Sequence, residues 1–124
     1  MKSYTYLEGR KAMKKIKAIL EKMMNSFIIV EGKKDVESLK EMGLKAHTIL
    51  EMNKAKGDVM ILTDNDREGD RLAKMIYDEL LPNPNVNTID TNSRKILCSI
   101  LNIKTFESFG RKIKEFENEI MEVI

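Results

Sequence analysis

The stretch that decides the fold is Val59–Leu72, which reads VMILTDNDREGDRL. Its apolar first half ends abruptly in acids at alternate positions, Asp64, Asp66 and Glu68, and Gly69 and a helical pattern follow at once. Carboxylates packed this closely repel one another, and a bound divalent cation is the usual relief. The stretch therefore predicts a buried strand that leads directly into an acidic turn able to hold a cation.

The segment after the acids predicts a helix over 67–81, because apolar residues recur at helical spacing from Leu72 to Leu80. Pro82 cannot continue that helix. Residues 86–90 are then typical of another short strand, so the acidic turn lies between a strand and a helix that leads to a further strand.

The segment before the acids repeats this order. Phe27–Val30 is a short apolar run rich in β-branched residues, which predicts a strand buried on both faces, and it ends at Glu31. Asp35 can cap the helix that follows, and Gly43 can end it. Residues 46–51 form a weaker second strand before the loop that leads to the third.

Helical patterns flank this region on both sides. Residues 6–24 form an amphipathic pattern with lysines outside the apolar stripe. Asn92 or Ser93 can cap a helix over 94–101, and Thr105 can cap a last helix. The apolar stripe of that last helix consists of Phe109, Ile113, Phe116, Ile120 and Val123.

Short buried strands that alternate with helices predict an α/β fold with three layers, built on a short, mainly parallel four-stranded sheet. We expect one compact domain with three parts: a basic helix in 1–25, a core in 26–91, and helices packed on that core in 92–124. A length of 124 residues suits a single hydrophobic core.

Composition excludes several classes of protein. Apolar residues make up 42% of the chain and charged residues 34%, and no apolar run approaches the roughly 20 residues that cross a bilayer. A single cysteine, Cys98, cannot form an internal disulfide, and with the single histidine, His47, it cannot build a zinc site. We expect a cytoplasmic protein with no membrane partner.

The net charge of +2 conceals an asymmetry. Residues 1–25 carry seven Lys or Arg and two Glu, a net charge of +5, so the remainder carries −3. A basic helix on a slightly acidic body is compatible with a polyanionic partner, and equally with a solvated, lysine-rich helix face.

The acids of the two strand ends are expected to meet. Ligands in open parallel sheets lie beyond the carboxyl ends of the strands, and neighbouring strands are about 4.8 Å apart. If the first and third strands are neighbours, Glu31 converges with Asp64 and Asp66. Oxygen ligands without His or Cys favour Mg²⁺ or Mn²⁺.

Basic residues beside the acids suggest a phosphate substrate. Lys33, Lys34, Arg67 and Arg71 flank the two acidic segments and can hold phosphate oxygens. Acids, a hard metal ion and basic neighbours together are typical of phosphoryl transfer.

Other interpretations of the acids fit less well. An EF-hand loop that began at Asp64 would need a bidentate Glu where Met75 stands. A phosphatase of the haloacid type, with Asp64 as its nucleophile, usually has Thr or Val where Glu68 stands. Helix capping accounts well for Asp35, but it does not require three acids at two strand ends.

The segments Val30–Asp35 (VEGKKD) and Thr63–Asp70 (TDNDREGD) resemble the two motifs of the Toprim domain. That domain is shared by type IA and type II topoisomerases, bacterial-type primases and the nuclease that matures 5S ribosomal RNA. The resemblance covers roughly residues 26–91, and it implies the three-layer fold described above.

The resemblance also implies roles for individual residues. Asp64 and Asp66 would bind Mg²⁺, Glu31 would act as the acid–base or metal-linked glutamate, and Glu68 would be a third acid that only some members use. Of the basic residues, we expect Lys33 and Arg67 to steady the phosphate.

These residues lead to a functional hypothesis: Mg²⁺-dependent phosphodiester cleavage or transfer on RNA or DNA, nuclease-like or primase-like, on a single-stranded or structured substrate. A metal-loaded module that binds nucleic acid or protein without chemistry is the alternative, and a small-molecule phosphatase is a third. The sequence leaves a homo-oligomer open.

Overall fold

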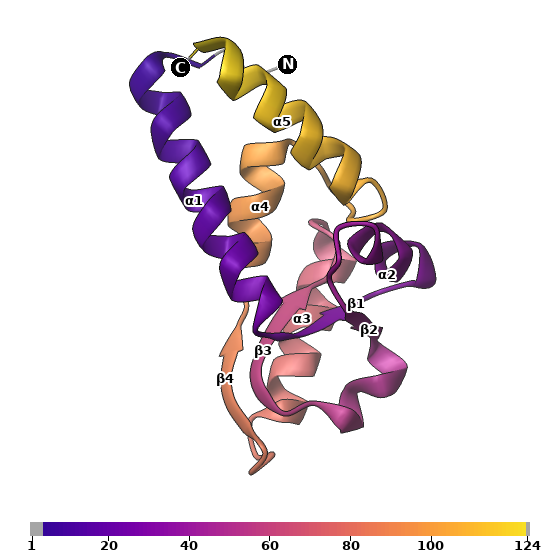
Figure 1. Cartoon of the computed structure of the whole chain (residues 1–124). Coiled ribbons are helices and arrows are strands. Elements are labelled where there is room, and N and C mark those ends of the chain that lie inside the picture. Colours follow the sequence, from indigo (N-terminus) through magenta and orange to yellow (C-terminus); the bar gives the residue numbers. More distant parts are fainter. Residues whose placement is uncertain (1–3, 124) are drawn as a thin grey trace.

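A computed structural model describes residues 4–123 of the chain (Figure 1). The elements follow one another in this order: α1 (Tyr6–Met24), β1 (Phe27–Val30), α2 (Lys33–Lys40), β2 (Ala46–Thr48), the 3₁₀ helix η1 (Ile49–Lys54), β3 (Gly57–Leu62), α3 (Arg67–Leu80), β4 (Val86–Asp90), α4 (Ser93–Leu101) and α5 (Phe109–Val123).

The four strands form one sheet in the order β2-β1-β3-β4, and every neighbouring pair is parallel. The predicted α/β class and three-layer arrangement are therefore confirmed, and the sheet is entirely parallel. β1 and β3 are central neighbours, with Val30 opposite Leu62. The residues that follow these two positions consequently emerge side by side.

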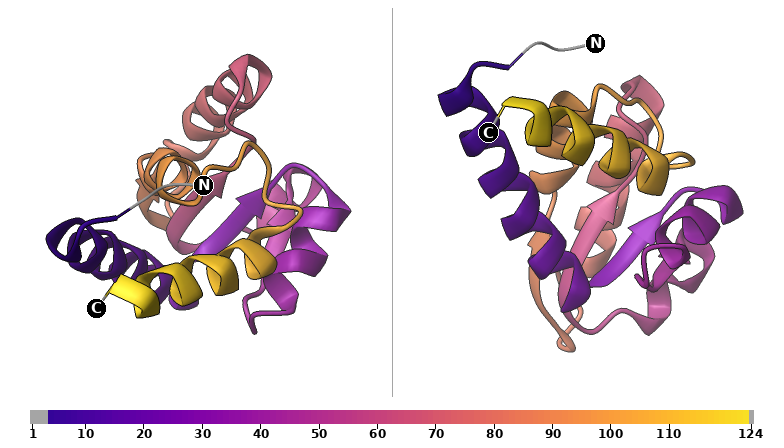
Figure 2. Two further views of the ribbon diagram at one scale, coloured as in Figure 1. Left: turned by 90° about the horizontal axis from the view of Figure 1, so that it is seen from above. Right: turned by 45° about the horizontal axis from the view of Figure 1, so that its top comes forward.

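Both faces of the sheet are buried, as the apolar runs predict. Along β1, Ile28 and Val30 point into one core cluster and Ile29 into another, which is the two-residue period of a strand. The first cluster is covered by α1, α2, α4 and α5, and the second by α3 and η1 (Figure 2).

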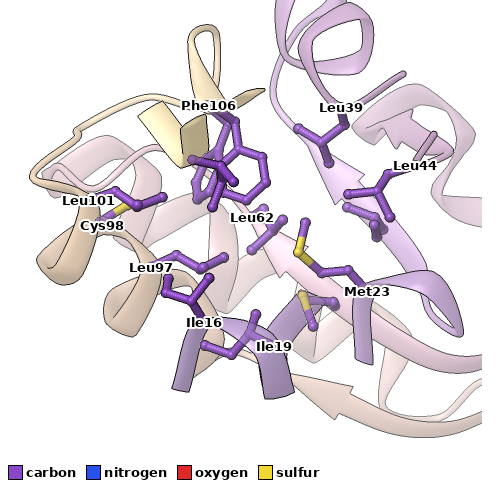
Figure 3. Packing of buried hydrophobic residues seen from close by; sticks show 14 of the residues in the cluster. Ile16, Ile19, Met23, Leu39, Leu44, Leu62, Leu97, Cys98, Leu101 and Phe106 are labelled. Atoms are coloured by element: carbon purple, nitrogen blue, oxygen red, sulfur yellow. The ribbon is translucent and has the colours of Figure 1, made fainter. Parts of the chain in front are cut away.

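The larger cluster joins the flanking helices to the sheet. Figure 3 shows residues of α1 (Ile16, Ile19, Met23) and α4 (Leu97, Cys98, Leu101) gathered around Leu62 of β3 and Phe106. Phe106 and Phe109, on either side of the start of α5, are fully buried. The flanking helices therefore share one core with the sheet.

The structure corrects two predicted boundaries. The strand predicted over 46–51 ends at Thr48, because Thr48 pairs with the last residue of β1, Val30, and the chain turns into η1 where no further partner residue is available. The last helix begins at Phe109, so Thr105 is not its N-terminal cap.

The N-terminus of α4 also differs from the prediction in detail. Asn92 precedes α4, but its side chain makes no capping hydrogen bond. Instead Asp90 Oδ1 accepts hydrogen bonds from the amides of Asn92 and Ser93. The last residue of β4 thus caps the helix that follows it.

None of the helices described for residues 4–123 is long and apolar enough to cross a membrane.

Candidate metal centre

Two of the predicted acids, Glu31 and Asp64, lie next to each other beyond the ends of β1 and β3. Glu31 follows β1 directly, and Asp64 follows β3 after Thr63. The amide N–H of Asp64 donates a hydrogen bond to Glu31 Oε2 at 2.6 Å. The side chain of one strand end is thereby fixed to the backbone of the other.

Asp64 lies in a strongly negative environment. Burial, together with the charges of Glu31, Asp35, Asp66 and Glu107, raises the pKa of Asp64 to about 7. We call these five residues the acidic cluster. Burial is the largest cause of this rise, and the neighbouring carboxylates add to it, so the fold disfavours the charged form of Asp64.

Asp35, which the sequence predicts as an N-cap, is also a member of the acidic cluster. It lies in the first turn of α2, after Gly32 at the N-cap position, and its Oδ2 accepts a hydrogen bond from the Gly32 amide at 3.1 Å. Its Oδ1 is buried and has no hydrogen-bond partner among the described residues. Burial also raises the pKa of Asp35, and the charges of Glu107 and Glu31 add to that effect.

Asp66 caps α3, because its Oδ1 accepts a hydrogen bond from the Gly69 amide at 2.7 Å. A Cβ atom at Gly69 would lie 1.7 Å from the carbonyl oxygen of Asp64, so only glycine fits there. Thr63 Oγ1 donates to the Gly69 carbonyl at 2.7 Å. The turn between β3 and α3 is therefore closely packed, and the positions of Asp64 and Asp66 are well determined.

A residue that the sequence interpretation missed supports this turn from behind. Arg94, only 3% exposed, donates from Nε to the Thr63 carbonyl at 2.8 Å and from Nη2 to the Asp64 carbonyl at 2.7 Å. Nη2 also contacts Asp70 Oδ1 at 2.5 Å. A signal was present in the sequence: Arg94 shares the helical spacing of the buried residue Leu97, and an arginine on an apolar stripe needs a buried partner.

Further bonds fasten the same turn to the C-terminal part of the chain. Lys95 Nζ donates to Asn65 Oδ1 at 2.8 Å and to Asp70 Oδ1 at 2.7 Å. The Asn65 amide donates to the Lys104 carbonyl at 2.6 Å. Lys95 and Arg94 hold the pKa of Asp70 below its ordinary value. The segment after α4 is therefore part of the site, which the motif pattern alone did not indicate.

The structure does not bring the fourth predicted acid into the cluster. Glu68 is 60% exposed at the side chain and pairs with Arg71 on the next turn of α3. Arg71 also lowers the pKa of Glu68. Lys33 and Arg67 are exposed at the first residues of α2 and α3, beside Glu31 and Asp66 respectively.

The donor set suits a hard divalent cation. It consists of carboxylate oxygens, including the unpartnered Oδ1 of Asp35. Across residues 4–123, however, no three His, Cys, Asp or Glu side chains are arranged to hold one ion together. Mg²⁺ usually takes one or two carboxylates and keeps several waters, so the cluster fits such an ion without a full protein cage.

Comparison with known proteins identifies relatives of the chain. It is 33% identical over 96 residues to a UPF0292 protein of Pyrococcus furiosus, in a match that covers 67% of this chain and 70% of that protein. A UPF0292 protein of Methanocaldococcus jannaschii is 41% identical over 64 residues, 42% of this chain and 50% of that protein. No family model matches the chain.

A solved structure of a protein from Aquifex aeolicus has a similar fold. It superposes with a TM-score of 0.58 at 26% sequence identity, over 77% of this chain and 94% of that one.

Proposed function

This chain belongs to the UPF0292 family, and we propose that it catalyses Mg²⁺-dependent phosphoryl transfer on a nucleic acid. The observation that carries the proposal is the 2.6 Å hydrogen bond from the Asp64 amide to Glu31 Oε2, which joins the acids of two adjacent strand ends. Its position beyond the carboxyl edge of a parallel sheet is the usual place for a ligand in such folds.

Asp64 and Asp66 are the proposed metal ligands, with Glu31 as a bridging ligand or as the acid–base group. A bound Mg²⁺ would neutralise charge on the phosphate and polarise its oxygens. The raised pKa of Asp64 supports this assignment, because a cation would offset both its burial and the charges of the neighbouring acids.

The chain's own residues would supply positioning and proton transfer. Glu31 Oε2 accepts the Asp64 N–H, and the carboxylate would take a proton from an attacking hydroxyl through its other oxygen, Oε1. Lys33 and Arg67 would contact the phosphate at the N-termini of α2 and α3, where helix dipoles also favour an anion.

The second candidate function is a metal-loaded module that binds nucleic acid or protein without chemistry. It would use the same acidic cluster and the exposed Lys33 and Arg67. Strong, salt-sensitive binding of nucleic acid without turnover would support this alternative.

The experiment that separates the two uses end-labelled single-stranded and structured RNA and DNA, incubated with Mg²⁺ or Mn²⁺. We expect Asp64→Asn to lower turnover at least about 100-fold, because it removes a charged ligand. Asp78→Asn is the control, since Asp78 is an exposed acid on α3, the helix that follows Asp64, and is paired with Lys74. Turnover that persists unchanged in Asp64→Asn contradicts the residue assignment.

A further inference from the structure

One face of α1 carries positive charges that form no ion pair among the described residues. The opposite face packs Ala12, Ile16 and other residues into the larger core cluster. Arg10, Lys14 and Lys17 are exposed and lie within about 60° of one another around the helix, at 100° per residue. We call these three residues the basic face.

The basic face is not neutralised within the chain. On α3 and α5, exposed Arg71, Lys74 and Arg111 each pair with an acid one turn away. Among the described residues, Arg10, Lys14 and Lys17 form no such pair, although Glu21 lies one turn beyond Lys17.

Arg10 has a different contact, which holds its charge at the surface. Its Nη1 donates to Tyr6 Oη at 2.9 Å, and its guanidinium lies 5.6 Å from the centre of the Tyr6 ring. Neither contact cancels the positive charge of Arg10. Three unpaired cations on neighbouring turns repel one another, and a polyanion is the ligand that relieves this repulsion.

The contacts at the two ends of α5 indicate how far the basic face lies from the acidic cluster. Glu107, just before α5, acts on Asp64, whereas Ile120 and Val123 at its other end pack against Gly9 of α1. Figures 1 and 2 show α5 running from the neighbourhood of α2 to the N-terminal part of α1. A helix of 15 residues is about 22 Å long, which corresponds to about six phosphates along one strand of a duplex.

We propose that the basic face of α1 is a second contact surface for the phosphate backbone of a nucleic acid, separate from the acidic cluster. The choice of a nucleic acid as the polyanion rests on the proposed function. The spacing of the three cations, about 10 Å from Arg10 to Lys17 along the helix, places them against about three phosphates of one strand.

The first test measures binding without turnover, in EDTA, by the fluorescence anisotropy of a labelled oligonucleotide of about 20 nucleotides, between about 50 and 200 mM salt. The variant is Arg10→Gln/Lys14→Gln/Lys17→Gln. The control, Lys40→Gln/Lys45→Gln/Lys56→Gln, removes the same charge from exposed lysines elsewhere. The plot of log K against log salt has a negative slope. Loss of three phosphate contacts should make this slope shallower by about 2 to 3 and weaken binding about tenfold or more.

The outcomes separate the inference from the proposed function. A changed slope in the basic-face variant, with the control close to wild type, supports the inference whether or not any turnover is found. Equal slopes in all three proteins overturn it. Preferential binding of phosphatidylserine vesicles through the same three residues, with oligonucleotide binding unaffected, also overturns it.

A second readout applies if the wild type turns over nucleic acid. The basic-face variant should lower kcat/KM on an oligonucleotide of about 20 nucleotides and leave it unchanged on one of about four, which is too short to span α5. An equal loss on both lengths would contradict a separate contact surface, because it would indicate damage at the acidic cluster.

Discussion

At the scale of single residues, the site depends on charges that the fold holds in unfavourable surroundings. Asp64 lies among four other acids, and Arg94 is buried behind the turn that carries it. Each of these charges is compensated by a different means: Asp64 by a cation in the proposed function, and Arg94 by two carbonyl oxygens and Asp70. The two residues should therefore respond differently to substitution.

Asp64→Asn should stabilise the metal-free protein at pH 8. The pKa of Asp64 rises from 3.8 to about 7 on folding, so the folded chain binds a proton more tightly than the unfolded chain between these values. The stability that the folded chain gains by holding this proton is fully present below about pH 4. It is lost as the pH rises through 7, where Asp64 becomes charged. The gain in the variant at pH 8 should be about 1–2 kcal/mol, because partial exposure screens the repulsion.

Urea unfolding in EDTA at pH 4 and pH 8 measures the effect as a difference between the variant and the wild type, which cancels the titration of other groups. The advantage of Asp64→Asn should be present at pH 8 and small at pH 4. A variant that is less stable than wild type at pH 8 would show that burial and the surrounding acids do not disfavour the charged form of Asp64.

Arg94→Met should destabilise the fold by about 3–5 kcal/mol, because it leaves the carbonyls of Thr63 and Asp64 without their donors inside the protein. Arg71→Met is the control, since Arg71 is exposed and its one ion pair within residues 4–123 is with Glu68; its effect should stay within about 0.5 kcal/mol. Chemical denaturation gives both values. Similar small effects in both variants would mean that water replaces the guanidinium of Arg94.

At the scale of elements, the sequence predicted best where a strong local signal marks a boundary. β1 and β4 have the predicted bounds, and α3 begins at Arg67 because Asp66 caps it. The strand over 46–51 was predicted too long, because its length is set by its partner β1 and not by its own residues. Thr105 was a plausible cap, but the chain instead buries Phe106 and bonds the Lys104 carbonyl to Asn65.

The last helix, α5, tests how well the helical spacing of apolar residues predicts which side chains are buried. Of its predicted stripe, Phe109, Ile113, Phe116 and Ile120 are buried, whereas Val123 is 36% exposed. We expect Phe116→Ala to cost about 3–5 kcal/mol, the usual range for removing a buried aromatic side chain.

Met121→Ala is the matched control on the same helix, because Met121 is 75% exposed, and its effect should stay within about 0.5 kcal/mol. Thermal unfolding followed by far-ultraviolet circular dichroism compares the two variants. Equal losses of stability would indicate that α5 does not contribute its stripe to the core.

At the scale of the whole molecule, the acidic cluster draws on distant parts of the chain. Strand-end reasoning predicted that Glu31, Asp64 and Asp66 meet, because the rule depends only on which strands are neighbours. It could not predict Glu107 or Arg94, since no local pattern relates either residue to the turn after β3. Tertiary packing alone brings them there.

Mg²⁺ should stabilise the folded protein as a whole, since the cluster exists only in the native chain. The gain follows RT ln(1 + [Mg²⁺]/Kd), about 2.7 kcal/mol at 100 times Kd. The midpoint of thermal unfolding should therefore rise with Mg²⁺ in the wild type and in Asp78→Asn, and stay constant in Asp64→Asn. An equal rise in all three proteins would assign the effect to non-specific screening.

The hydrogen bond from the Asn65 amide to the Lys104 carbonyl also has a consequence during synthesis on the ribosome. Both acidic motifs emerge from the exit tunnel well before residue 104 does. Until the later segment arrives, the turn after β3 lacks Arg94, Lys95 and this backbone acceptor. A nascent chain therefore lacks the native form of this turn, and in the proposed function the cation would bind only once nearly all of the protein has been made.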